Sequence, residues 1–165
     1  GVDQLKNLVY SINTNPDSRR LMISAWAPHE MNDMALPPCH YAFQVYINNG
    51  VMDLMWQQRS ADVFLCLPYD IAMYGLLLEM LAKGSGLKAG QLIGQLGDCH
   101  LYNNHLDQAK VYLNRPNIPA SPKVNIDYGI FIDTEKCLYI PDSSEIKLTN
   151  YNPLPAIKAE LSVGK

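Results

Sequence analysis

The chain has 165 residues, of which 48% are hydrophobic and 18% are charged, and its formal net charge at pH 7 is −3. This composition predicts a single globular domain over residues 1–165 and excludes a disordered or low-complexity chain. The slight acidity argues against a nucleic-acid partner, and no stretch approaches the ~18–20 consecutive apolar residues of a membrane-spanning helix.

The first part of the chain predicts a helix followed by strands. Residues 2–13 place apolar side chains at helical spacing, and a polar turn follows them. Residues 19–26 predict a strand. Residues 40–68 predict two strands joined by an Asn-Asn-Gly turn at 48–50, a typical hairpin signal.

The second part predicts helices and strands in alternation. Residues 69–86 are nearly all apolar and predict a helix about 11–14 residues long that is central to the fold. Residues 91–102 predict a buried strand, and residues 103–114 a short amphipathic helix that the Pro-rich residues 115–122 interrupt. Residues 123–151 show the alternating pattern of side chains that predicts strands. The sequence therefore predicts a mixed α+β fold.

The side chains that could carry chemistry lie near the ends of the predicted strands. Each has an ordinary alternative: a lone cysteine is usually buried structure, and adjacent arginines are usually solvated. The combination is more informative, because guanidinium groups suit phosphate oxygens and a nearby cation favours the thiolate form of a cysteine. The four cysteines are widely spaced without a Cys-x-x-Cys pair, so we expect a reducing, cytoplasmic setting and no metal.

Five motifs follow one another along the chain: PDSRR, MALPPCH, QRSADVFL-LP, GD-HLY-NH and NPLPAIKA. In their order and spacing they resemble the motifs of the thymidylate synthase family, and the resemblance covers nearly all of residues 4–163. The family includes the deoxyuridylate and deoxycytidylate hydroxymethylases. The resemblance implies an α+β fold with a mixed β-sheet and a central buried helix, whose sheet packs back to back with that of a second copy in a homodimer.

The resemblance also implies an enzyme that transfers a one-carbon unit from 5,10-methylenetetrahydrofolate to carbon 5 of a deoxypyrimidine 5′-monophosphate. That carbon reacts only after a nucleophile has added at carbon 6 of the ring. Cys39 matches the family's nucleophile, and Arg59 matches the group that binds the phosphate beside the thiol. Asp62 matches the residue that contacts both the pyrimidine and the pterin. We expect these three residues to be catalytic.

The same resemblance assigns the binding residues. The expected nucleotide contacts are Arg19, Arg20, Gln58, Arg59, Ser60, Asp62, Asp70, His100 and Tyr102. Within this set, the arginine pair 19–20 would reach the partner subunit's phosphate, and residues 100 and 102 would hold the sugar hydroxyl. The expected folate contacts are Leu36, Asp62, Leu65, Cys66 and Tyr69, although Cys66 stands where the family usually has glycine. Two interpretations of His40 stay open: it is either a histidine packed in the core or a residue that supports the direct ligand contacts.

Asp70 departs from the thymidylate synthases of the family, which have Asn at this position. A carboxyl group can accept a hydrogen bond from the cytosine amino group, so we expect deoxycytidylate to be favoured, as in a deoxycytidylate hydroxymethylase. Alternatively, Asp70 only caps a helix that starts at Ile71, and the protein methylates deoxyuridylate to thymidylate. A third possibility is a non-catalytic remnant that binds nucleotide or supplies a dimerisation sheet.

The motifs correspond to the C-terminal part of the family domain. The family's N-terminal part, with its catalytic glutamate, would be absent, so we expect the chain alone to turn over little. At the other end, Glu160 replaces a proline and residues 164–165 run past the usual end. We expect both changes to alter the contact that closes over the folate.

Overall fold

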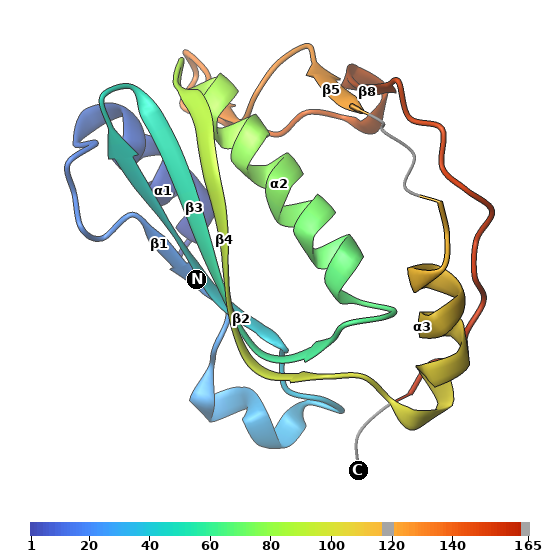
Figure 1. Ribbon diagram of the computed structural model, residues 1–165. Coiled ribbons are helices and arrows are strands. Elements are labelled where there is room, and N and C mark those ends of the chain that lie inside the picture. The colour runs from blue at the N-terminus through green and yellow to red at the C-terminus, as the bar shows by residue number, and fades with distance from the viewer. Residues whose placement is uncertain (117–120, 163–165) are drawn as a thin grey trace.

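The computed structural model describes residues 1–116 and 121–162, which form a mixed α+β structure (Figure 1). The α-helices in these residues are α1 (Gln4–Thr14), α2 (Leu67–Gly84) and α3 (Leu106–Leu113). The long strands are β2 (His40–Asn48), β3 (Val51–Asp62) and β4 (Lys88–His100). The short strands are β1 (Met22–Ser24), β5 (Lys123–Ile126), β6 (Phe131–Ile132), β7 (Leu138–Tyr139) and β8 (Ile146–Thr149).

The principal sheet is mixed, with the strand order β1-β2-β3-β4. The pairs β1–β2 and β2–β3 are antiparallel, whereas β3 and β4 are parallel and connected through α2. The predicted hairpin is confirmed, because Asn48 pairs with Val51 across a two-residue turn. Asn49 and Gly50 both have positive φ, 49° and 76°, as a tight hairpin turn requires. This turn sets the register of β2 and β3.

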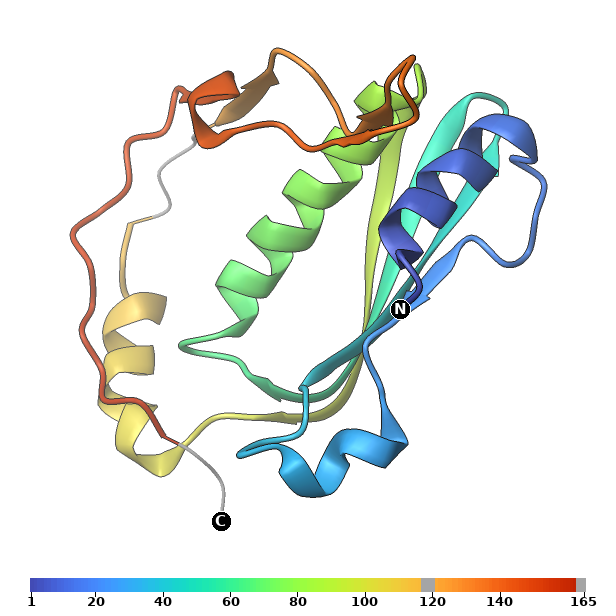
Figure 2. The ribbon, with the colours of Figure 1, turned by 180° about the vertical axis from the view of Figure 1, so that it is seen from behind.

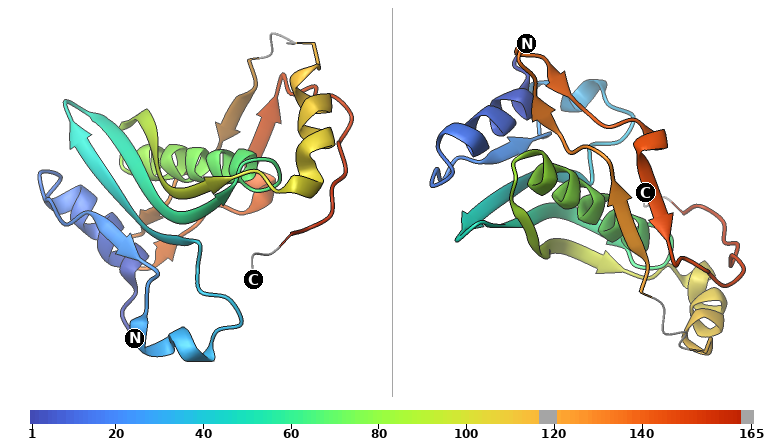
Figure 3. Two further views of the ribbon diagram at one scale, coloured as in Figure 1. Left: turned by 60° about the horizontal axis from the view of Figure 1, so that its bottom comes forward. Right: turned by 90° about the horizontal axis from the view of Figure 1, so that it is seen from above.

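The core lies between the sheet and the helices α1 and α2. Every second residue of β3 is buried up to residue 58, namely Met52, Leu54, Trp56 and Gln58, and the last two residues of the strand, Ala61 and Asp62, are buried as well. The Trp56 ring stacks on the Tyr74 ring of α2, with centroids 5.2 Å apart. The helix lies along the sheet in both views of Figure 3. The alternation of β3 therefore directs one face to the core and brings α2 beside the strand ends.

The helix α2 is longer than predicted and only partly covered. It spans 18 residues and begins at Leu67, with a proline in its first turn, where a missing N–H costs nothing. Its exposed apolar side chains include Tyr69, Ile71 and Met73. In the described residues, one face of this helix thus remains open.

The predicted burial of the strand at residues 91–102 is wrong for this chain. Most residues of β4 are exposed, and Ile93 keeps 42% of its surface accessible. The reason is that β4 is an edge strand of the sheet and that, within the described residues, α2 covers one of its faces.

The C-terminal part wraps around the rest of the chain. The helix α3 confirms the predicted short helix, whereas the predicted interruption falls partly on residues 117–120, outside the described residues. The predicted strands of 123–151 form two small antiparallel pairs, β5–β8 and β6–β7. After β8 the chain passes α3 and returns towards the end of β3 (Figure 2). Residues 164–165 also lie outside the described part.

Within the described residues, no helix combines the length and apolarity needed to cross a membrane.

Candidate active site

A pocket of about 630 Å³ opens where the parallel strands β3 and β4 end and α2 begins. This volume lies within the roughly 300–1,000 Å³ that is typical of small-molecule sites. The last residues of the two strands, Asp62 and His100, are paired neighbours. The lining residues are Leu36, Cys39, His40, Gln58, Arg59, Ser60, Asp62, Cys66, Asp70, Asp98, His100, Tyr102, Leu161 and Ser162.

The Cys39 thiol faces the guanidinium of Arg59. Arg59 Nη2 lies 3.9 Å from Cys39 Sγ. The guanidinium also donates to the carbonyl oxygens of Pro37 and Pro38, at 2.7 and 3.1 Å. The two prolines restrict the backbone, and the hydrogen bonds to their carbonyl oxygens hold the guanidinium beside the thiol. A positive charge therefore stands beside a potential sulfur nucleophile.

Asp70 is a buried carboxylate held by two pocket side chains. Its Oδ2 accepts from Gln58 Nε2 at 3.0 Å, and its Oδ1 lies 3.3 Å from His40 Nε2. The interpretation of Asp70 as a helix cap is wrong, because α2 begins at Leu67 and Cys66 occupies the N-cap position. The carboxylate is instead part of the pocket. His40 contacts the pocket as well as the core, since its ring also packs against Tyr74.

Within the described residues, only one of the two carboxylate oxygens of Asp62 accepts hydrogen bonds. Its Oδ1 accepts from the backbone N–H groups of Phe64 and Leu65, at 2.9 and 3.3 Å. Its Oδ2 is buried without a hydrogen-bond partner among the described residues and lies 3.9 Å from His105 Nδ1. Buried polar atoms are seldom left unpaired, so this oxygen is suited to accept a bond from a ligand or a moving side chain.

His100 and Tyr102 form the opposite wall. Their rings meet edge to face with centroids 4.8 Å apart, and His100 Nδ1 lies 3.5 Å from a carboxylate oxygen of Asp98. Both side chains offer polar atoms close to the strand ends. This wall could hold the hydroxyl groups of a bound sugar.

Cys66 is the second cysteine of the pocket and differs from Cys39 in its surroundings. Burial raises the pKa of the Cys66 thiol, and the negative charges of Asp62 and Asp70 raise it further. A raised pKa keeps a thiol protonated and unreactive at neutral pH. The charged neighbours of the two thiols, a guanidinium beside Cys39 and carboxylates near Cys66, thus favour Cys39 as the nucleophile.

Four predicted site residues do not line the pocket. Arg19 and Arg20 are exposed in the turn after α1, Tyr69 is 76% exposed, and Leu65 contributes its backbone N–H to Asp62 instead. Their predicted roles remain predictions.

Sequence reasoning missed some residues at the pocket. They are Asp98, His105, Leu161 and Ser162. The first two lie inside the GD-HLY-NH motif, so the motif itself contained the signal, whereas the tail residues carry none. Within the described residues, no group of three or more His, Cys, Asp or Glu side chains is placed to hold a metal ion.

The fold and the pocket define a class of protein: a mixed α+β chain that presents a thiol, a guanidinium and two buried carboxylates around one small-molecule site. The family model described as thymidylate synthase matches residues 1–163. The chain belongs to the thymidylate synthase family, whose members are one-carbon transferases.

Two relatives show how close the similarity is. The thymidylate synthase of Listeria monocytogenes serotype 4a is 45% identical over 162 residues, which are 98% of this chain and 50% of the relative. That of Listeria innocua serovar 6a is 45% identical over 163 residues, with the same two shares. The chain thus spans about half the length of the curated relatives it matches.

Proposed function

We propose that the chain is the nucleophile-bearing part of a thymidylate synthase, which methylates deoxyuridylate at carbon 5. Membership of the family supports a one-carbon transfer, and the relatives' name favours methylation over the hydroxymethylation expected from the sequence. The observation that carries the proposal is the Cys39 thiol 3.9 Å from the Arg59 guanidinium, inside the pocket.

Covalent catalysis explains why a thiol is needed. Cys39 Sγ forms a bond to carbon 6 of the pyrimidine, and the electron pair of the 5,6 double bond moves towards the carbonyl at carbon 4. Carbon 5 becomes nucleophilic, forms its bond to the methylene carbon carried by the folate and loses its proton to solvent. The bond between that carbon and the folate nitrogen would then break, and a hydride from the reduced pterin would complete the methyl group and leave dihydrofolate. The carbon–sulfur bond then breaks and regenerates the thiolate. Arg59 compensates the charge of the thiolate and offers donors to the nucleotide phosphate.

The pocket has features that suit a pterin. 5,10-Methylenetetrahydrofolate supplies the one-carbon unit and the hydride that reduces it to a methyl group. The buried Oδ2 of Asp62, which has no hydrogen-bond partner in the described part of the chain, can accept from a ring N–H. Leu36 and Leu161 supply apolar wall. Cys66 also lines the pocket, and its side chain makes the pocket smaller than it would be with the glycine that the family usually has at this position.

Deoxycytidylate is the second candidate substrate because of Asp70. Its carboxylate is held in the pocket by Gln58 and His40, and an ionised carboxylate accepts well from the cytosine amino group. The same carboxylate would oppose the carbonyl at carbon 4 of uracil, acceptor against acceptor. A measurement of which base the protein prefers therefore decides between deoxycytidylate and deoxyuridylate as its substrate.

The relatives' length supports a further part of the proposal. We infer that the chain works as the C-terminal half of a protein about twice as long. We also propose, from the sequence resemblance, that this protein assembles as a homodimer. In such a dimer, the exposed Arg19 and Arg20 would serve the phosphate of the partner's nucleotide. We expect turnover from the longer protein and little from residues 1–165 alone.

The test is the release of tritium from deoxyuridylate labelled at carbon 5, measured with the longer protein. Cys39→Ser should abolish release and leave nucleotide binding intact, because the serine hydroxyl is a far weaker nucleophile. Cys137→Ser is the matched control, since Cys137 is exposed and outside the pocket. Equal losses in both variants would refute the assignment. Nucleotide binding without any tritium release by the unmodified protein would support the non-catalytic alternative.

A further inference from the structure

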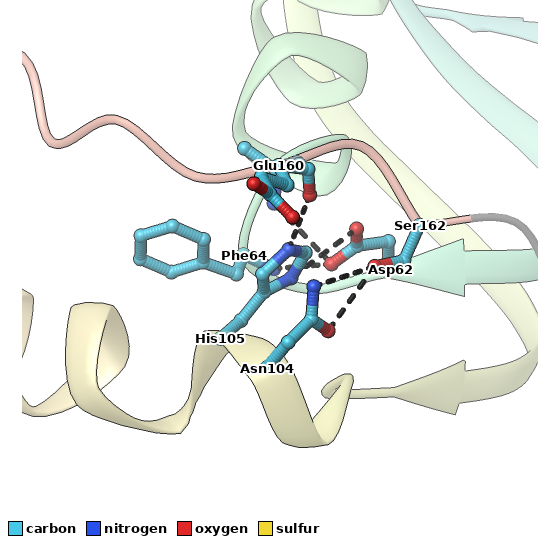
Figure 4. A network of polar contacts seen from close by, with 7 residues as sticks. Asp62, Phe64, Asn104, His105, Glu160 and Ser162 are labelled. Atoms are coloured by element: carbon cyan, nitrogen blue, oxygen red, sulfur yellow. Dashed lines mark hydrogen bonds and ion pairs between the residues drawn. The ribbon is translucent and has the colours of Figure 1, made fainter.

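His105 is a buried imidazole that lies between the C-terminal tail and the pocket. It is 0% exposed and packs between the rings of Phe64 and Tyr102, at centroid distances of 5.6 and 5.8 Å. Its Nε2 lies 2.7 Å from the carbonyl oxygen of Glu160, so Nε2 carries a proton and donates to the tail. Its Nδ1 faces Asp62 Oδ2 at 3.9 Å (Figure 4).

A second contact fixes the same stretch of tail. The Asn104 side chain exchanges two hydrogen bonds with the Ser162 hydroxyl, at 2.9 and 3.1 Å (Figure 4). The residue between the two anchored positions, Leu161, lines the pocket. Two consecutive residues before α3 thus hold the tail against the wall of the site.

In this network, His105 and Asp62 face each other without forming a hydrogen bond. His105 Nδ1 and Asp62 Oδ2 are both buried and lack a hydrogen-bond partner among the described residues. An N–H···O bond needs a distance of about 2.7–3.2 Å, so a movement of roughly 1 Å would form it. Because Nε2 already donates to Glu160, this bond needs a second proton on the ring, whose charge the carboxylate compensates.

We propose that His105 is a positioning residue that transmits the position of the C-terminal tail to the Asp62 carboxylate. When the tail moves, the Glu160 carbonyl carries the imidazole with it and changes the Nδ1–Oδ2 distance. Asp62 Oδ1 meanwhile stays bound to the turn at residues 64–65, so the carboxylate pivots about that turn. The functional consequence rests on the proposed function, in which the Asp62 carboxylate contacts the pterin, whereas the Asp62 backbone contacts the pyrimidine.

The first test uses nuclear magnetic resonance of the 165-residue chain and needs no activity. Ser162→Ala loosens the tail at the Asn104 contact, and the amide resonances of Phe64 and Leu65 report on Asp62. We expect Ser162→Ala to shift both resonances. In a His105→Gln background, the glutamine amide can still donate to Glu160, but nothing faces Asp62, and the same change should leave both resonances in place.

Three results would overturn this inference. The first is that Ser162→Ala leaves the Phe64 and Leu65 amides unmoved. The second is that it moves them equally in both backgrounds, which would indicate a route that bypasses His105. The third is an imidazole nitrogen spectrum in which His105 Nε2 carries no proton. If His105→Gln does not fold, His105→Asn removes the Glu160 bond instead and is used for the same comparison.

The second readout is kinetic and uses the longer protein. His105→Gln should raise the KM for the folate about tenfold, with the nucleotide Kd unchanged. The reason is that the Asp62 carboxylate can no longer receive the one buried hydrogen bond that His105 Nδ1 donates once the two atoms approach. A merely structural role would weaken both ligands equally, and that result would overturn the proposal. If the unmodified protein shows no activity, the proposed function fails, while the resonance experiment still decides the role of His105.

Discussion

At the scale of single residues, the two pocket cysteines are distinguished by their neighbours. Cys39 faces a guanidinium, whereas Cys66 faces the carboxylates of Asp62 and Asp70. Two thiols in one pocket can therefore have opposite chemical roles. The motifs predicted Cys39 as the nucleophile, but the surroundings of Cys66 depend on contacts that no motif describes.

The raised pKa of Cys66 predicts a slow reaction with iodoacetamide. Burial and the carboxylates favour its protonated form, so the midpoint of its pH–rate profile should lie above 9.0, the ordinary cysteine value. Asp70→Asn removes one of those charges and should lower the midpoint. Mass spectrometry of labelled peptides measures each site, with the exposed Cys137 as internal control. A Cys66 midpoint at or below 9.0 would contradict the prediction.

Asp70 should govern the choice of base. Asp70→Asn exchanges an acceptor for an amide that can donate to the uracil carbonyl, so the ratio of deoxyuridylate to deoxycytidylate activity should rise, by up to ~10⁴-fold. Tritium exchange at carbon 5 with each nucleotide in parallel gives the ratio. The preference of the unmodified protein then identifies the substrate. An unchanged ratio would show that Asp70 does not read the base.

At the scale of elements, hydrophobic periodicity predicted α1, the hairpin and α3 well because each depends on local sequence. It placed the start of α2 too late, since Leu67 and Pro68 begin the helix without a polar cap residue. The anchoring of the tail by His105 was beyond prediction, because that bond spans 55 residues and ends on a backbone carbonyl, which carries no sequence signature.

The two glycines of α2 give a matched pair of stability predictions. A Cβ at Gly84 would overlap the backbone of Ile130, whereas a Cβ at Gly75 would meet only Leu92 Cδ2, at 3.8 Å. Gly75→Ala should raise the free energy of unfolding by about 0.5–1 kcal/mol, because alanine is the better helix former. Gly84→Ala should lower it by more than about 2 kcal/mol, since backbone must move. Urea denaturation measures both, and equal effects would refute the assigned packing.

At the scale of the whole molecule, the exposed face of the sheet supports the predicted homodimer. This face displays the apolar side chains Met22, Tyr46 and Ile93, which α2 does not cover. The pocket is built from one chain, but the exposed arginines 19–20 lie outside it. A second copy packed on the sheet would cover the apolar side chains.

A charge placed on that face should dissociate the dimer. Ile93→Glu should convert a sedimenting dimer to a monomer at micromolar concentration, because a buried, unpaired charge opposes association. Leu113→Glu is the control, since Leu113 is 81% exposed at the end of α3 and away from the sheet. If the unmodified protein sediments as a monomer, or if both variants dissociate equally, the sheet is not the interface.

The central claim is that Cys39 forms a covalent bond to the pyrimidine, and peptide mass spectrometry tests it most directly. The longer protein is incubated with 5-fluorodeoxyuridylate and 5,10-methylenetetrahydrofolate, then digested. Fluorine cannot leave carbon 5 as a proton does, so the carbon–sulfur bond should persist. We predict that the nucleotide mass is found on the peptide containing Cys39 and is absent in Cys39→Ser. An unmodified Cys39 peptide, or the added mass on the Cys66 peptide, would contradict the claim.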